Sequence, residues 1–100
     1  MAVGGRDYSQ YVFTTSSEME QEKASVTDAE TTVTFSAEVK AWVLYNDGPY
    51  PVYFNDSTGV STNNFKLPSG AWMMVDVPAT TIYLICNTGE TATVFALGLR

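Results

Sequence analysis

The sequence predicts an all-β protein, a small antiparallel β-sandwich or barrel of jelly-roll-like form with an extended N-terminal arm. Apolar and polar residues alternate from Val33 to Tyr45, the pattern of a strand with one buried face. Beyond this segment, clusters of Gly, Pro, Asn and Asp recur roughly every 8–12 residues without helical periodicity between them, which is typical of antiparallel β domains. We therefore expect an acidic arm at residues 1–30 and a β-sandwich domain at residues 31–100.

The size and composition of the chain agree with one small domain. The chain has 100 residues, of which 45% are hydrophobic, enough for a modest core. A domain of this size buries roughly two-thirds of the surface that its unfolded chain exposes, so association would add stability. The N-terminus has no signal-peptide core, and no apolar run approaches the ~20 residues of a membrane-spanning helix. We expect a protein made in the cytoplasm and used there or released by lysis.

Net charge and the scarcity of Cys and His exclude several function classes. The net charge of −6 argues against nucleic acid and the membrane surface as partners, because both attract basic faces. With the single cysteine Cys86 and no histidine, the sequence cannot form an intrachain disulfide, a Cys/His zinc site or a Ser-His or Cys-His catalytic pair. We expect no cofactor.

The first 30 residues are acidic and poor in large apolar side chains. Their charged residues are Asp7, Glu18, Glu20, Glu22, Asp28 and Glu30 against Arg6 and Lys23, a net charge of −4. The only apolar cluster is "DYSQYVF", with Tyr8, Tyr11, Val12 and Phe13. We predict that this cluster anchors the arm to a groove or sheet edge of a neighbouring subunit. A flexible polar tail is the alternative, and residues 18–23 could form a short helical turn.

The alternating segment at residues 33–45 predicts one long strand, or two strands in line with a bend near Ala37. Its odd positions are apolar and are expected to face the core. Trp42 and Leu44 break the alternation, which indicates that the second half is covered on both faces.

Five shorter strands are expected at residues 50–54, 60–67, 71–77, 80–86 and 91–99. The second of these is weakly apolar and is predicted to be an edge strand, whereas residues 80–86 are apolar throughout and are predicted to be central. The side chains expected to be largely buried are Val33, Phe35, Val39, Val43, Val52, Phe54, Met73, Val75, Ile82, Leu84, Val94 and Ala96.

Two Asn-Asp pairs flank the strand at residues 50–54. Asn46-Asp47 precedes Gly48, and Asn55-Asp56 lies shortly before Gly59. Asn and Asp bond their own backbone in tight turns, and Gly supplies a positive φ. A calcium loop would alternate its oxygen ligands and add a later bidentate acid, which neither turn does. We therefore interpret both pairs as turn residues that bind no metal.

The remaining acid–base candidates are five carboxylates that the sequence places apart. They are Glu38, Asp47, Asp56, Asp76 and Glu90. Carboxylate catalysis needs two such groups on either side of a cleft, and the spacing brings no pair together. Cys86 follows the alternation of Ile82 and Leu84, so it is predicted to be a buried small hydrophobe. We expect no enzyme activity and no catalytic residue.

Aromatic residues are the remaining binding candidates. Trp42 and Trp72 fall on the face opposite the predicted core stripe, where they would form an exposed apolar patch typical of a protein contact. A sugar-binding module is the alternative, since aromatic rings stack on sugars and Asn or Asp side chains bond hydroxyl groups. The aromatic residues available for this are Trp42, Tyr45, Tyr50, Tyr53, Phe54 and Trp72.

The segment from Trp42 to Leu97 resembles the small all-β structural proteins of tailed-phage virions. The resemblance rests on "NDGPYPVYF", on "LPSGAWMMVDV" and on the final "TTIYLICNTGETATVFAL". It covers a little over half of the chain, and much of it is hairpin chemistry that other β proteins share.

The resemblance implies a structural virion protein without catalytic residues. Capsid decoration (cement) proteins, head–tail and tail adaptors and parts of fibres belong to this group. An acidic arm beside a compact β domain favours a decoration protein at capsomer junctions. Its partners would be sister subunits, in a homo-oligomer such as a trimer, and the major capsid or a tail protein. A carbohydrate-binding or host-receptor-binding module is the alternative function.

Overall fold

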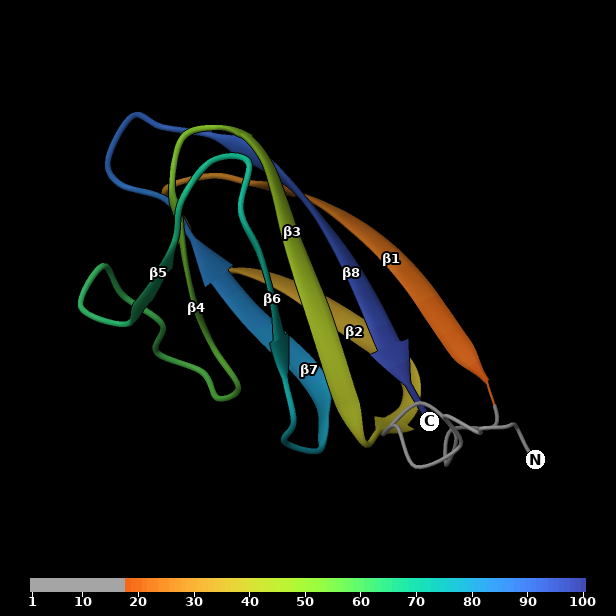
Figure 1. Cartoon of the computed structure of the whole chain (residues 1–100). Coiled ribbons are helices and arrows are strands. Elements are labelled where there is room, and N and C mark those ends of the chain that lie inside the picture. The colour runs from red at the N-terminus through yellow and green to blue at the C-terminus, as the bar shows by residue number, and fades with distance from the viewer. Residues whose placement is uncertain (1–17) are drawn as a thin grey trace.

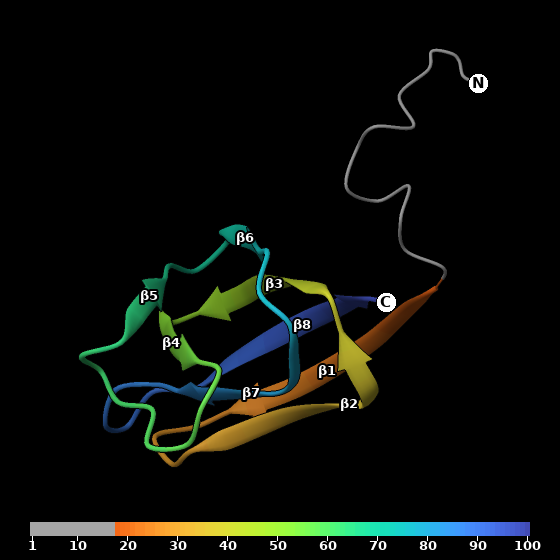
Figure 2. The same cartoon turned by 90° about the horizontal axis from the view of Figure 1, so that it is seen from below.

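The computed structural model describes residues 18–100, which form two antiparallel sheets stacked face to face (Figures 1 and 2). Sheet A has the strand order β1-β8-β3-β6, and sheet B has the order β2-β7-β4-β5. The strands are β1 (Met19–Val26), β2 (Thr31–Val39), β3 (Ala41–Pro49), β4 (Val52–Asn55), β5 (Phe65–Leu67), β6 (Trp72–Val75), β7 (Ala79–Ile85) and β8 (Ala92–Leu99).

The topology is that of a jelly roll, as the sequence predicts. The antiparallel pairs β1–β8, β2–β7, β3–β6 and β4–β5 make one long hairpin with its tip between β4 and β5. Successive pairs lie alternately in sheet A and sheet B, so the hairpin is rolled up. Within each sheet, two of these pairs are joined side by side, by β3–β8 in sheet A and by β4–β7 in sheet B.

The predicted edge position of the strand at residues 60–67 and the predicted central position of the strand at residues 80–86 are confirmed. β5 is an edge strand of sheet B, although it covers only the end of the expected segment at residues 60–67. β7 lies between β2 and β4, in the interior of the same sheet. β6, a strand of four residues, forms an edge of sheet A.

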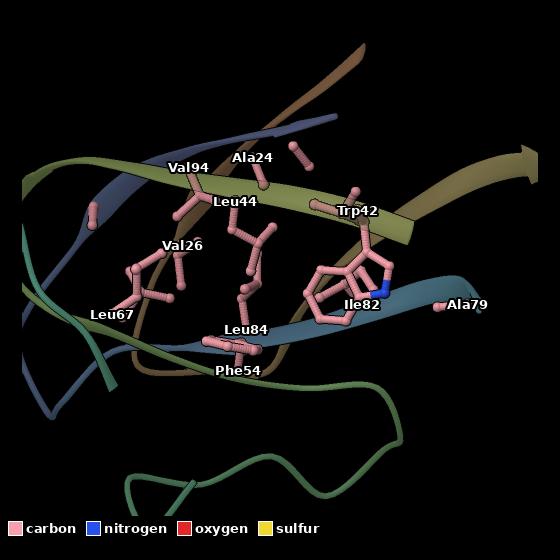
Figure 3. Close-up of a cluster of buried hydrophobic side chains, with 14 of the residues drawn as sticks. Ala24, Val26, Trp42, Leu44, Phe54, Leu67, Ala79, Ile82, Leu84 and Val94 are labelled. Carbon is pink, nitrogen blue, oxygen red and sulfur yellow. The ribbon is translucent and has the colours of Figure 1, made fainter. Parts of the chain in front are cut away.

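The core lies between the sheets and is built around Trp42 (Figure 3). The Trp42 side chain is 1% exposed, and its ring meets Phe54 edge to face at a centroid distance of 5.7 Å. Its Nε1–H donates a hydrogen bond of 2.9 Å to the carbonyl of Val77, so burial leaves no unpaired donor. All the side chains expected to be largely buried are so, except Val43, Met73 and Val75, which are half-buried.

The segment at residues 33–45 is two strands in different sheets, and the inward-facing parity changes between them. β2 faces the core with Val33 and Phe35, whereas β3 does so with Trp42 and Leu44. The register of β2 shifts between Thr34 and Val39, and the chain bends at Lys40 before β3 joins sheet A. Val39 is still buried after this shift, so the inward-facing parity changes at the bend at Lys40, where the chain crosses from sheet B to sheet A. Val43 and Tyr45 therefore point outward in β3.

The close approach of β2 to β8 requires a glycine. A Cβ atom at Gly98 would lie 2.6 Å from Cγ1 of Val39 and 2.9 Å from Cε1 of Phe35. The missing side chain therefore leaves the space in which Phe35 packs across the sandwich.

β1 corrects the predicted boundary between arm and domain at residue 30, because this strand is already part of the domain. The predicted helical turn at residues 18–23 is wrong. Residues 19–26 pair along their whole length with β8, and Ala24 and Val26 are buried in the core. At the other end of β1 the inward positions are Glu20 and Glu22, so the apolar alternation is too short to be recognised. The candidate anchors Tyr8, Tyr11, Val12 and Phe13 lie outside the described residues.

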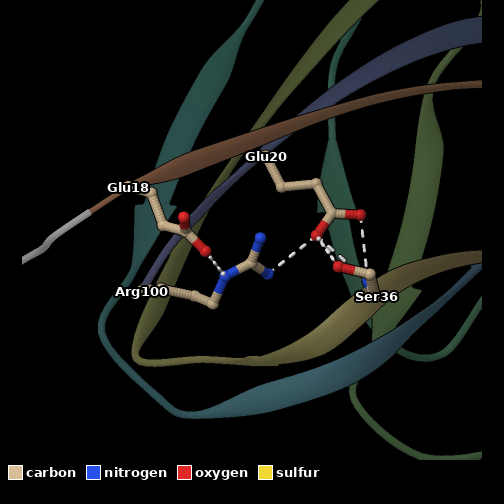
Figure 4. A network of polar contacts seen from close by, with 4 residues as sticks. All are labelled: Glu18, Glu20, Ser36 and Arg100. Carbon is tan, nitrogen blue, oxygen red and sulfur yellow. Dashed lines mark hydrogen bonds and ion pairs between the residues drawn. The ribbon is translucent and has the colours of Figure 1, made fainter.

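Glu20 is held by contacts with two distant segments (Figure 4). Both of its carboxylate oxygens accept the backbone N–H of Ser36, at 3.0 and 2.9 Å, and Oε1 also accepts the Ser36 hydroxyl. Ser36 lies in the irregular part of β2, so Glu20 replaces a missing strand partner. Arg100 bonds Glu20 and Glu18 at 2.7 Å each and thus ties the end of the chain to β1.

Two further acids near the end of β1 order loops through backbone N–H groups. Glu30 accepts the N–H groups of Gly59 and Val60, at 2.8 and 3.2 Å. Asp28 accepts the N–H of Gly89 at 3.0 Å. Charge-assisted bonds of this kind are stronger than bonds between neutral groups. The acidity of this segment therefore serves the fold of the domain itself.

Asn46 is a buried polar side chain with its hydrogen bonds satisfied. Its Nδ2 donates to the carbonyls of Tyr50 and Leu67, at 2.9 and 3.0 Å, and its Oδ1 accepts the N–H of Gly48 at 2.8 Å. Gly48 has a φ of 87°, and a Cβ atom there would meet Oγ of Ser69. The interpretation of Asn46 as a turn residue is confirmed, and the same side chain joins the turn to the end of β5.

Asn46→Ala should destabilise the domain by about 2–4 kcal/mol, because it leaves the Leu67 carbonyl and the Gly48 N–H buried without their partner and also unpairs the partly buried carbonyl of Tyr50. The matched control is Asp47→Ala, at an exposed neighbouring position, which should change the free energy of unfolding by less than ~0.5 kcal/mol. Urea unfolding followed by tryptophan fluorescence measures both. Equal losses in the two variants would contradict the role given to Asn46.

The Glu20 network predicts a pH dependence of stability. Hydrogen bonds from Arg100, and then from Ser36, lower the pKa of Glu20 from 4.5 to about 2. A folded-state pKa below the unfolded value contributes stability above pH 4.5, and this stability is lost as the pH falls towards 2. Glu20→Gln should therefore show a smaller fall in Tm across this range than the natural chain.

Glu22→Gln is the control for this experiment. The Glu20 carboxyl raises the pKa of Glu22. The stability that Glu22 contributes is therefore present at low pH and is lost as the pH rises through its folded-state pKa, which is the opposite pH dependence to that of Glu20. This variant should keep the loss of stability at low pH. Thermal unfolding at a series of pH values, followed by circular dichroism, measures the Tm of each variant. The role of Glu20 would be refuted if the Tm of Glu20→Gln fell from pH 4.5 towards pH 2 by as much as that of the natural chain.

Candidate binding face on the outer side of sheet A

The outer face of sheet A carries a row of aromatic side chains. The strand register places Phe95 beside Tyr45 and Tyr45 beside Trp72, in adjacent strands β8, β3 and β6. Their exposed fractions are 41%, 38% and 67%. Lys23 extends the row across β1. We call Phe95, Tyr45 and Trp72 the aromatic row.

Apolar residues continue this surface along the strands. Leu97, Val43 and Met74 form the neighbouring register row in β8, β3 and β6, and each is half-buried. A shallow pocket of about 270 Å³ lies beside the aromatic row, and Met19, which is 62% exposed, forms part of its wall. Contiguous exposed apolar surface of this kind marks a contact site in small proteins.

Within and beside the row, Phe95 and Tyr45 contact each other and neighbouring polar side chains. The rings of Tyr45 and Phe95 are 6.4 Å apart and tilted by 34°. The Lys23 ammonium lies 5.5 Å from the centroid of Phe95, within the range of a cation–π contact. The Tyr45 hydroxyl donates to Oδ1 of Asp47 at 3.4 Å. An apolar centre with polar groups at its rim is the usual arrangement of a protein interface.

The outer face of sheet B has a different character. β2 presents Thr32 and Thr34, which pair with Tyr83 and Thr81 of β7. The hydroxyls of Thr34 and Thr81 are 3.4 Å apart. This face is therefore rich in hydroxyl groups, and the two sides of the sandwich offer different surfaces to a partner.

The two predicted interface tryptophans do not share a surface. Trp72 is exposed as expected, but Trp42 is buried on the inner face of the same sheet, so the predicted Trp42–Trp72 patch is wrong. The cause is the change of parity before β3, which also turns Tyr45 outward. Phe95 is an interface candidate that the sequence reasoning missed. It lies between the small buried residues Val94 and Ala96, and this alternation is the signal that could have identified it.

The predicted carboxylates and Cys86 form no shared centre in the described part of the chain. Glu38, Asp47, Asp56 and Asp76 are exposed at separate places, and residues 18–100 contain no group of three Cys, Asp or Glu side chains arranged to hold a metal ion. Cys86 is buried as predicted. Burial, followed by the charges of Glu90 and Asp28, raises the pKa of its thiol, which disfavours the reactive thiolate.

Comparisons with protein-family models, with curated proteins and with solved structures gave no match for this chain. Within residues 18–100 there is no helix long and apolar enough to cross a membrane. The outer face of sheet A is therefore the feature from which we infer a function.

Proposed function

We propose that the protein is a non-enzymatic structural component of a tailed-phage virion, a capsid decoration protein that binds at capsomer junctions. The aromatic row carries this proposal. It provides an apolar surface on the broad face of a β-sandwich, where it can contact a repeated protein surface. Jelly rolls recur in viral capsid proteins, which is an argument by analogy of fold.

The aromatic row has the properties of an interface centre. Each large aromatic side chain can bury about 150–250 Å² in a contact, and Trp and Tyr are enriched among the residues that dominate binding energy. The rings of Tyr45 and Phe95 already contact each other, so ordering these two side chains on binding costs less entropy. Many weak contacts on a regular shell then act together, because each bound copy of an oligomer raises the effective concentration of the next.

We place the contact between sister subunits at β6. This edge strand has the sequence Trp72–Val75, "WMMV", without a charged residue. The opposite edge of sheet A, β1, carries Glu20, Glu22 and Lys23. Charged side chains protect sheet edges against pairing with other chains, and β6 lacks this protection. A homo-oligomer joined at β6 would also bring several aromatic rows to one particle surface.

Cross-linking of native particles with an amine-reactive reagent tests the proposal. Lys23 lies at the end of the aromatic row, whereas Lys66 is exposed in β5, at the edge of sheet B. We expect Lys23 to be linked to a major capsid protein at a stoichiometry that follows the shell symmetry. Links to a neck or tail protein at low copy number would instead indicate an adaptor. Predominant links from Lys66 would contradict the assigned face.

Charged substitutions in the aromatic row should abolish attachment without unfolding the protein. Phe95→Glu and Trp72→Glu place a charge on the face at exposed positions, so Tm should change little, whereas binding to particles that lack the protein should weaken at least ~30-fold. The matched control is Thr32→Glu, on the outer face of sheet B. Co-sedimentation of the variants with particles measures the effect, and equal binding by all three would refute the proposal.

The proposed intersubunit arm is tested by a chain that begins at residue 18. A chain that begins at residue 31 is unsuitable, because it lacks β1 and with it the buried Ala24 and Val26. Removal of residues 1–17 should leave Tm nearly unchanged and should reduce incorporation into the particle or oligomer. Unchanged incorporation would show that the segment with Tyr8, Tyr11, Val12 and Phe13 is not required.

A further inference from the structure

A second pocket, of about 280 Å³, lies on another part of the molecule from the aromatic row. Phe65 of β5 lines it together with Val75 and Val77, which belong to β6 and the segment that follows it. The polar wall consists of Asn55, the last residue of β4, and of Asp56 and Asn64 from the connection between β4 and β5. The pocket therefore lies where an edge strand of sheet B faces an edge strand of sheet A.

The apolar wall of this pocket is an aromatic side chain supported by the core. Phe65 is 61% exposed, and its ring meets Phe54 edge to face at 5.7 Å. Phe54 in turn meets Trp42 at 5.7 Å, and the Trp42 indole is fixed by its bond to Val77. The exposed ring is thus held from behind by two buried rings, as a stacking platform requires.

The polar wall offers both acceptors and donors. Oδ1 of Asn64 accepts the N–H of Ser61 at 2.8 Å, and Oδ1 of Asn55 accepts the N–H of Asp56 at 2.9 Å. These bonds set the orientation of both side-chain amides. Among the described residues, neither Nδ2 of Asn64 nor the carboxylate of Asp56 has a hydrogen-bond partner. Asp56 and Asn64 both line the pocket, so its wall includes a residue with an available amide donor and a residue with an available carboxylate acceptor.

We propose that this pocket binds a neutral pyranose sugar. A pyranose has an apolar face of C–H groups that can lie on the Phe65 ring, and hydroxyls that donate to Asp56 and accept from Asn64. The volume is near the lower end of the ~300–1,000 Å³ of ligand pockets, which suits one sugar ring. The Asp56 carboxylate disfavours acidic sugars by charge repulsion. This inference does not depend on the proposed role in a virion.

The test is a titration of the full ¹⁵N-labelled chain, followed by NMR. The probes are glucose, galactose, mannose and N-acetylglucosamine, each as the free sugar and as its α- and β-methyl glycoside. We expect at least one to give saturable shifts of the Asn55 and Asn64 side-chain amides and the Trp42 indole N–H, with a Kd of about 1–10 mM. Binding of a methyl glycoside would identify the terminal residue of a glycan, and binding of only the free sugar would identify a free monosaccharide.

Three variants separate this pocket from the aromatic row. Phe65→Ala and Asp56→Ala, at exposed positions, should each weaken binding at least about tenfold, a loss of ~1.4 kcal/mol. Trp72→Ala is the matched control, because Trp72 is similarly exposed but lies on the outer face of sheet A, and it should bind as the natural chain does. The proposal would be overturned if no probe gave saturable shifts up to ~50 mM, or if Trp72→Ala alone abolished them.

Discussion

The burial of Trp42 between the two sheets is the constraint on which the rest of the structure depends. β3 pairs with both β8 and β6, so the direction in which its side chains point decides the direction for all three strands. With Trp42 and Leu44 inside, Val43 and Tyr45 must point outward. The register then places Phe95 and Trp72 beside Tyr45, and the aromatic row results. The same indole supports the ring of Phe54 and, through it, the wall of the second pocket.

Polar side chains close the ends of the sandwich where the strands cannot bond one another. Glu20 bonds the irregular part of β2, Glu30 and Asp28 bond loops, and Asn46 joins the ends of β3 and β5. Each accepts from or donates to backbone groups that would otherwise lack a protein partner. The bonds of Asn46 to Leu67 and Gly48 are buried, where an unpaired group is costly. A small domain has little apolar surface to bury, so such bonds are an important part of its specificity.

The two proposed surfaces are compatible with each other. The aromatic row lies on the broad outer face of sheet A, whereas the second pocket lies between the edge strands β5 and β6. A protein attached to a particle through the broad face keeps its pocket available, except where sister subunits cover β6. Both surfaces depend on the same strand, because Tyr45 and Trp42 belong to β3.

The sequence by itself determined the all-β class, the central position of β7 and the turn role of Asn46, because alternation and turn chemistry are local properties of the chain. It did not reveal β1, whose inward positions include Glu20 and Glu22. The Glu20 carboxylate is stabilised there by Ser36 and Arg100, which are distant in the sequence. The outward position of Tyr45 and Phe95 was decided by the tertiary structure. The bend at Lys40, where the chain crosses from sheet B to sheet A, exchanged the faces of β3, and periodicity alone cannot show which face of a strand the core will cover.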